Sequence, residues 1–249
     1  MTCRSSAKII FTASIISLTG LSVASAQSLK TLTNDPLILG FHLGMSQSDI
    51  KDWFSAHKLE YPAPQINSGK VQLDGVMPFD GVITVRSIKD KTEENFLFEF
   101  SPPFDGNVLV GILRSVNYGL DANAGPNYRD LEKALFSRYG EFPSSTFFGQ
   151  NMFWVSGGTL SEEGELRQCT YTNGLNFQAL LPATKGCGLT LDVEITNNSS
   201  HPGSVFIYQS TLWDQDRIVA YEQKAISMAR AGAEEKAKAS QNTAVPPKL

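Results

Sequence analysis

The sequence predicts an α+β fold with two tandem repeats, each a helix followed by an antiparallel sheet, and a C-terminal helix. Two amphipathic helical patterns and a series of short runs of alternating apolar residues indicate this class. The chain has 249 residues, 41% of them hydrophobic and 18% charged, with 15 Phe available for a core. This composition is typical of one large or two small folded domains. One continuous antiparallel sheet with helices on one face is the alternative arrangement.

Residues 1–26 have the pattern of a signal peptide. Two basic residues precede a moderately apolar stretch, Ile9 to Val23, and Ala24-Ser25-Ala26 fits the small-x-small cleavage rule. A membrane anchor is the alternative, but about 15 helical residues reach roughly 22 Å, short of the ~30 Å hydrocarbon core. Residue 27 is Gln, so the lipid-accepting Cys of a bacterial lipoprotein is missing. We therefore expect a mature chain from Gln27 that is periplasmic if bacterial, otherwise secreted, without a transmembrane anchor.

The first repeat is predicted over residues 27–122. Ser46 is a candidate N-cap with Asp49 three residues later, and the apolar spacing that follows predicts a helix over 47–58. His57 ends the apolar face of this helix, where a structural role is favoured over that of a catalytic base. Alternating apolar side chains predict strands over 71–76, 82–88, 95–100 and 107–116, with a tight turn at Asp80-Gly81.

The second repeat is predicted over residues 123–212. A helix over 127–138 ends before Gly140, a residue suited to terminating helices. Strands are predicted over 151–156, 165–171, 175–181, 188–196 and 205–212, with a turn at Asn173-Gly174. An offset of 81 residues lays this helix and its strands on the first repeat. Residues 213–239 then form a C-terminal helix whose last turns leave the protein surface, and 240–249 a disordered tail.

Two cysteines remain after cleavage, Cys169 and Cys187. An even pair in an oxidising compartment usually bridges, so we predict a disulfide, with two buried free thiols as the alternative. The bridge would close a loop of about 18 residues and stabilise the fold by ~3 kcal/mol. A simple meander would leave the two residues on non-adjacent strands, too far apart to bridge. The segment from Pro182 to Gly188 should therefore fold back over the sheet, or the strand near Cys187 should pair with the one carrying Cys169.

Two segments carry a family resemblance. The run from Leu39 to Ser46, leading into Asp49-Ile50, resembles the Gly-Met-Ser/Thr helix opening of small exported proteins of the SmpA/OmlA (BamE-like) type. The run from Arg138 to Pro143, followed by Trp154, looks like the Gly-x-Pro and Trp strand that come after that helix. Tandem copies of such a module are similar to the β-lactamase-inhibitor-protein architecture. The resemblance implies a periplasmic, non-catalytic protein-binding module.

The sequence holds no local enzyme motif: Gly-x-Ser-x-Gly, His-Glu-x-x-His, Walker and Gly-x-Gly-x-x-Gly patterns are all missing. With 21 Lys and Arg against 25 Asp and Glu, and no basic cluster, nucleic-acid binding is not expected. Asp192 and Glu194 share one strand face and could pair as acid and base, but Leu191 and Val193 alternate with them, which favours a solvated outer face. We therefore predict no catalytic residue, metal or cofactor.

Aromatic side chains in two loops are the candidate binding residues. No charged residue occurs from Phe142 to Trp154, and aromatic and Met side chains are enriched at interface centres. Met152 and Trp154 are assigned to the core, whereas Phe147 and Phe148 lie in a loop that cannot easily bury both. Phe104 ends a second, Pro-containing loop. We expect a module that binds another envelope or secreted protein, including by inhibition; a hydrolase without a local motif and a carrier of a small apolar ligand are the alternatives.

Overall fold

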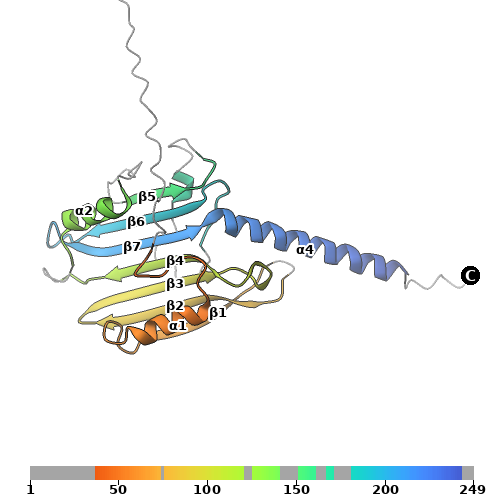
Figure 1. The fold of residues 1–249 in the computed structure, drawn as a ribbon, viewed down its shortest axis with the longest axis horizontal. Helices are drawn as coiled ribbons and strands as arrows, with labels where there is room; N and C mark the ends of the chain where they lie inside the picture. Colours follow the sequence, from red (N-terminus) through yellow and green to blue (C-terminus); the bar gives the residue numbers. More distant parts are fainter. Residues whose placement is uncertain are drawn as a thin grey trace, which may run out of the picture.

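The structure is a computed structural model that describes residues 37–73, 76–120, 125–140, 151–160, 167–170 and 181–242. Within these residues, seven antiparallel strands form one continuous sheet in the order β1-β2-β3-β4-β7-β6-β5 (Figure 1). The strands are β1 Gln65–Val71, β2 Phe79–Lys89, β3 Thr92–Phe100, β4 Leu109–Asn117, β5 Asn151–Ser156, β6 Leu189–Asn197 and β7 Val205–Asp214. The predicted α+β class is therefore confirmed.

Three α-helices accompany the sheet in the described residues: α1 Gln47–Ala56, α2 Tyr128–Tyr139 and α4 Gln215–Asn242. Ser46 and Asp49 form a capping box at the start of α1, in which the Ser46 hydroxyl accepts from the Asp49 N–H and the Asp49 carboxylate accepts from the Ser46 N–H. The Asn127 side chain caps α2, and Gly140 follows it with a φ of +85°. The starts of both helices lie where their sequence signals predict.

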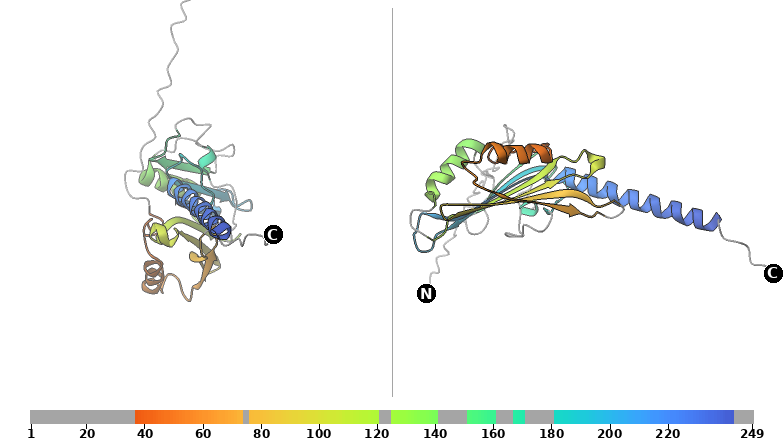
Figure 2. Two further views of the ribbon diagram at one scale, coloured as in Figure 1. Left: turned by 90° about the vertical axis from the view of Figure 1, so that its right-hand side faces the viewer. Right: turned by 90° about the horizontal axis from the view of Figure 1, so that it is seen from below.

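Helices α1 and α2 cover the same face of the sheet, above its two ends (Figure 2). The apolar side chains of both helices pack on the inward side chains of the strands. The N-terminal segment that begins at Ile38 packs there as well. Phe41 is fully buried and its ring lies within 6.0 Å of four other rings, counted between centroids. Those four rings belong to Trp53, Phe54, Phe96 and Phe98. Aromatic packing therefore fixes α1 on the sheet.

A second apolar layer covers the opposite face. There the start of α4 packs on the central strands through Ile218 and Tyr221, together with Trp213 at the end of β7. Leu181 joins this layer, and the Trp213 indole N–H donates to the Pro182 carbonyl oxygen at 3.1 Å. The segment from Pro182 to Gly188 therefore folds back over the sheet, as the sequence analysis predicts.

The structure confirms the disulfide between Cys169 and Cys187, with Cα atoms 5.5 Å apart and 18 residues of separation. Cys169 lies at the end of a short 3-10 helix, η2 Arg167–Cys169, and Cys187 lies just before β6. Both side chains are fully buried and pack against Val155 of β5. The bridge ties η2 to the strand pair at this edge of the sheet.

Thiol labelling tests whether Cys169 and Cys187 are joined. We expect a chain that begins at Gln27, unfolded without reductant, to present no reactive thiol, because its two cysteines, Cys169 and Cys187, are joined. After reduction, two thiols per chain should react. Two labelled thiols before reduction would contradict the bridge and restore the simple meander.

The strands do not follow the tandem repeat predicted over 27–122 and 123–212. The helices begin at Gln47 and Tyr128, which keeps the offset of 81. The same offset would make β5 and β6 the counterparts of β1 and β4, yet β5 pairs directly with β6 while β2 and β3 separate β1 from β4. The arrangement is the predicted alternative, one continuous sheet with α1 and α2 on one face, and the C-terminal helix α4 starts on the other.

Four local predictions are wrong. The first strand covers 65–71 rather than 71–76, and Asp80-Gly81 lies inside β2 rather than in a turn. Helix α4 continues to Asn242, past the predicted start of the tail at residue 240. Residues 167–169 of the strand predicted over 165–171 form the 3-10 helix η2 instead, so that prediction is wrong there. Residues 165–166, 171 and 175–180 of the predicted strands, and the turn at Asn173-Gly174, lie outside the described residues.

Candidate functional site

Two polar side chains interrupt an apolar row that crosses the helix-bearing face of the sheet. The strand register places six residues side by side in this row: Val85, Phe96, Arg114, Ser210, Val193 and Met152. Arg114 and Ser210 are direct neighbours across the pairing of β4 with β7. Neighbouring side chains on one face of a sheet have Cβ atoms about 5 Å apart. The two polar groups therefore meet at the centre of the sheet.

Arg114 forms an ion pair with Glu94 of β3, with 2.5 Å between Nε and the carboxylate Oε1. The side chains are only 18% and 14% exposed. The Tyr61 hydroxyl donates to the same carboxylate oxygen at 3.4 Å, and the Arg114 guanidinium lies 5.6 Å from the centroid of the Tyr208 ring. Burial, followed by the charge of Glu94, raises the pKa of Tyr61, which keeps its hydroxyl protonated as a donor.

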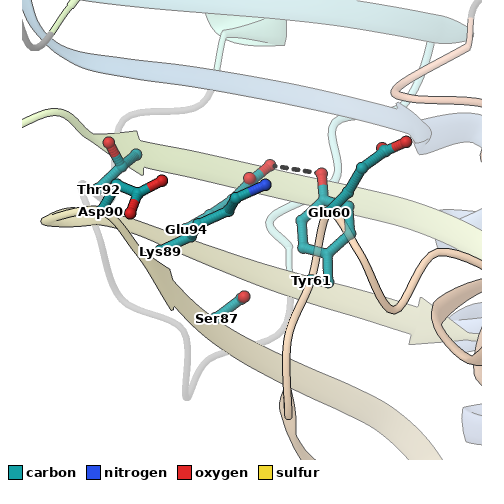
Figure 3. A pocket seen from close by; sticks show the side chains of 7 residues that line it. All are labelled: Glu60, Tyr61, Ser87, Lys89, Asp90, Thr92 and Glu94. Atoms are coloured by element: carbon teal, nitrogen blue, oxygen red, sulfur yellow. Dashed lines mark hydrogen bonds between the residues drawn. The ribbon is translucent and has the colours of Figure 1, made fainter.

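A cavity lies on each side of this ion pair. The first has a volume of about 230 Å³ and is lined by Glu60, Tyr61, Ser87, Lys89, Asp90, Thr92 and Glu94 (Figure 3). The second has a volume of about 200 Å³, and Arg114 and Ser210 line it. Glu94 thus borders one cavity and Arg114 the other. Among the residues that the structure describes, no group of three or more His, Cys, Asp or Glu side chains could hold a metal ion.

A buried carboxyl group, Glu99 of β3, links the elements of the layer on the opposite face. Glu99 is 1% exposed, and its two oxygens accept hydrogen bonds from the Tyr221 hydroxyl at 2.7 Å and from the Leu181 N–H at 2.8 Å. Burial raises the pKa of Glu99 to about 7. Glu99 therefore links β3 to both α4 and the segment that begins at Leu181.

Phe104, a predicted binding residue, lies on the opposite face of the sheet from the ion pair. Phe104 lies in a short 3-10 helix, η1 Pro103–Asp105, where its ring packs on the second apolar layer and the Lys224 ammonium lies 4.8 Å from the ring centroid. Its role in binding stays a prediction. Phe147 and Phe148 lie outside the described residues. Met152 and Trp154 are buried in the core, as predicted.

The strand face that carries Asp192 and Glu194 is not a solvated outer face at Asp192, which is only 4% exposed. Its neighbours in the register are Thr211 of β7 and Phe153 of β5. Thr211 is itself 1% exposed, so this part of the second face is covered. The expectation of solvation is therefore wrong at this position, although the two acidic side chains do share a face.

His57 has the structural role that its sequence position predicts. It follows α1, its ring stacks on Trp53 with 3.9 Å between centroids, and its Nδ1 lies 2.7 Å from the Trp53 carbonyl oxygen. The aromatic stack and the hydrogen bond together hold the end of the helix.

The sequence analysis missed the ion pair, although one signal for it exists. Arg114 is the one charged residue between Val108 and Val116, an otherwise largely apolar run that predicts a buried strand. A buried cation requires a partner, which a sequence reader would have to seek on a neighbouring strand. Glu94 is that partner, but its distance of twenty residues along the chain gives no local cue.

Comparison with known proteins gives no match to any family model, curated protein or solved structure. The resemblance to the SmpA/OmlA type therefore stays a prediction. Of the helices formed by the described residues, none combines the length and the apolar character that spanning a bilayer requires.

Proposed function

We propose that this protein is an exported, non-catalytic module that binds another envelope or secreted protein, and that α4 makes the contact. The observation that carries the proposal is the projection of α4 away from the sheet (Figure 1). Its first turns dock through Ile218, Tyr221 and Ala225, which are at most 4% exposed. No residue from Ile226 to Ala239 is buried. Residues 226–239, the exposed part of the helix, are therefore accessible to a partner.

The sequence of this exposed part suits helix-mediated recognition. Ile226 and Met228 are 43% and 45% exposed, and alanines follow them at several positions toward the C-terminal end of the helix. Apolar side chains on an exposed helix are anchors for a groove or a second helix on a partner. Glu234 and Lys238 stand four residues apart, a spacing that stabilises an isolated helix by about 0.2–0.5 kcal/mol.

Neither of the two cavities described above, which are lined by described residues, has the size of a lipid-carrier pocket. Their volumes of about 200 and 230 Å³ lie below the ~300–1,000 Å³ of typical ligand pockets. A lipid-like molecule needs a larger enclosed space. The disulfide supports export, because such bridges persist in oxidising compartments.

The proposal is tested by affinity capture from the envelope extract of the source, with the mature chain as bait. We expect the double variant Ile226→Asp/Met228→Asp to retain the partner at least tenfold less than the parent, since carboxylates in an apolar interface are costly to desolvate. Its melting temperature should stay the same, because both residues lie beyond the docked turns.

The matched control places two carboxylates at other exposed positions of the same helix, Gln223→Asp/Ser227→Asp. This control should retain the partner as well as the parent does. Equal retention by the parent and by the Ile226/Met228 variant would show that α4 does not make the contact.

A further inference from the structure

We infer that the second cavity, between α2 and the centre of the sheet, is a binding site for a small carboxylate with a short apolar chain. This inference concerns a ligand site and is independent of the protein contact proposed for α4. The cavity is lined by Leu37, Ile38, Leu39, Arg114, Leu131, Ala134, Leu135, Arg138, Tyr139, Leu191, Tyr208 and Ser210. This lining contains two guanidinium groups and no carboxylate.

Arg114 provides a fixed cation at the sheet side of the cavity. Its Nε–H is directed to Glu94, which holds the guanidinium in one orientation. A guanidinium has five N–H donors in a planar fork, so the Nη groups are free of this contact with Glu94. Glu94 neutralises the positive charge of Arg114. The guanidinium of Arg138, which also lines the cavity, carries a second positive charge that Glu94 does not neutralise. The net local charge therefore matches a ligand with one negative charge.

Ser210 is the observation that points to a ligand. It is 2% exposed and lines the cavity, and its Oγ has no hydrogen-bond partner among the described residues. Buried polar atoms are nearly always hydrogen-bonded, and leaving one unpaired is unfavourable. The hydroxyl is a direct cross-strand neighbour of Arg114. A carboxylate that accepts from both Ser210 Oγ–H and the Arg114 guanidinium would satisfy the serine.

The side chains that line the rest of the cavity indicate the chemistry of the part of the ligand beyond its carboxylate. Leu135, Leu191 and Ile38 are at most 6% exposed and are apolar, so a hydrocarbon chain would be buried there. The volume of about 200 Å³ admits a molecule smaller than a drug-sized ligand. On the α2 side, Arg138 is exposed and its guanidinium donates to the Leu37 carbonyl oxygen at 3.3 Å. The cavity thus pairs a cationic, hydrogen-bonding wall with an apolar one.

Calorimetric titration of the mature protein with sodium hexanoate at pH 7 tests the site. We expect saturable binding of one hexanoate per chain. Hexanol, which has the chain without the charge, should bind at least tenfold more weakly, and so should inorganic phosphate, which has the charge without the chain. Absence of saturable binding by hexanoate, or equal binding by hexanol, would overturn the inference.

Two variants locate the ligand. Ser210→Ala should weaken hexanoate binding about tenfold or more, the loss expected when a hydrogen bond to a charged group is removed, and should leave the melting temperature unchanged or higher. Arg138→Gln should weaken it severalfold. The matched controls are Thr211→Val, whose Oγ1 is also buried without a partner in the described residues but lies on the opposite face, and Arg129→Gln on an exposed part of α2. Equal affinities for all four variants would overturn the site.

Discussion

Replacing Arg114 by Met is expected to lower the free energy of unfolding by about 3–5 kcal/mol. The substitution keeps most of the side-chain volume. Among the described residues it leaves the Glu94 carboxylate, 14% exposed, with the Tyr61 hydroxyl as its remaining donor. A buried charge that has lost its partner retains its desolvation penalty without the compensating attraction. Glu94→Gln should have a similar effect, because it leaves the guanidinium unpaired. Urea denaturation at pH 7 measures both losses.

The double variant Glu94→Gln/Arg114→Met removes both charges and should recover most of the loss, since a neutral, well-packed pair is often as stable as a buried ion pair. The Arg86–Glu93 pair gives a matched control on the neighbouring strands. It has a 2.8 Å contact but side chains that are 50% and 34% exposed. Arg86→Met should therefore cost less than about 1 kcal/mol. Equal losses for Arg86→Met and Arg114→Met would contradict the role assigned to burial.

Glu99 should make the protein less stable as the pH rises from about 4.5 to about 7. In the folded protein its pKa is raised to about 7 from 4.5, mainly because the carboxyl is fully buried. The folded state therefore retains a proton in this window that the unfolded chain releases, so the stabilisation is complete below pH 4.5 and is lost as the pH passes through 7. One pKa unit corresponds to ~1.4 kcal/mol, so the free energy of unfolding should fall by about 3 kcal/mol over this pH range.

Comparison of the parent with Glu99→Gln isolates this contribution. The amide is neutral at every pH, and it can accept from the Leu181 N–H while donating to the Tyr221 hydroxyl oxygen. We expect the two proteins to have similar stability at pH 4 and the variant to be more stable by about 3 kcal/mol at pH 8. Glu222, a half-buried neighbour whose pKa burial also raises, is the control. Glu222→Gln should remove a smaller part of the pH dependence, and parallel curves for the parent and Glu99→Gln would contradict the linkage.

Local patterns were sufficient for the elements that depend on local interactions. The capping box of Ser46 and Asp49 lies within four residues, so the sequence alone marks the start of α1. Strands buried on at least one face, such as β3 and β6, show regular apolar alternation and were predicted to within three residues. Strand β1 was missed because it is an edge strand whose residues are mostly exposed on both faces, which removes the alternation.

Glycine at position 81 illustrates why a turn signal can be misleading. Asp80-Gly81 resembles a hairpin turn, but a Cβ atom at Gly81 would lie 2.6 Å from the Val71 side chain. The glycine allows β1 and β2 to approach each other near the bulge between Gly69 and Lys70. This requirement arises from a tertiary contact, so the dipeptide alone cannot reveal it.

The candidate sites were not predictable for the same reason. Glu94, Arg114 and Ser210 lie on three strands, and Glu99 meets Tyr221 across 122 residues of sequence. Their significance depends on burial and on strand order, and a single sequence specifies neither directly. The predicted repeat, with its offset of 81 residues, likewise depended on positions along the chain. In the sheet, the strand that comes last in the sequence, β7, lies between β4 and β6.

That position of β7 imposes an order on folding. It is the last strand along the chain, yet it pairs with both β4 and β6 and so joins the strands of the two halves. Until residues 205–214 are available, β4 and β6 each have an edge without its native partner, and the pairing of β4 with β7 must close a loop of nearly 90 residues. Contacts this distant in sequence form slowly. A chain that crosses a membrane from its N-terminus would complete its sheet only after residues 205–214 have emerged, when β7 can pair with both β4 and β6.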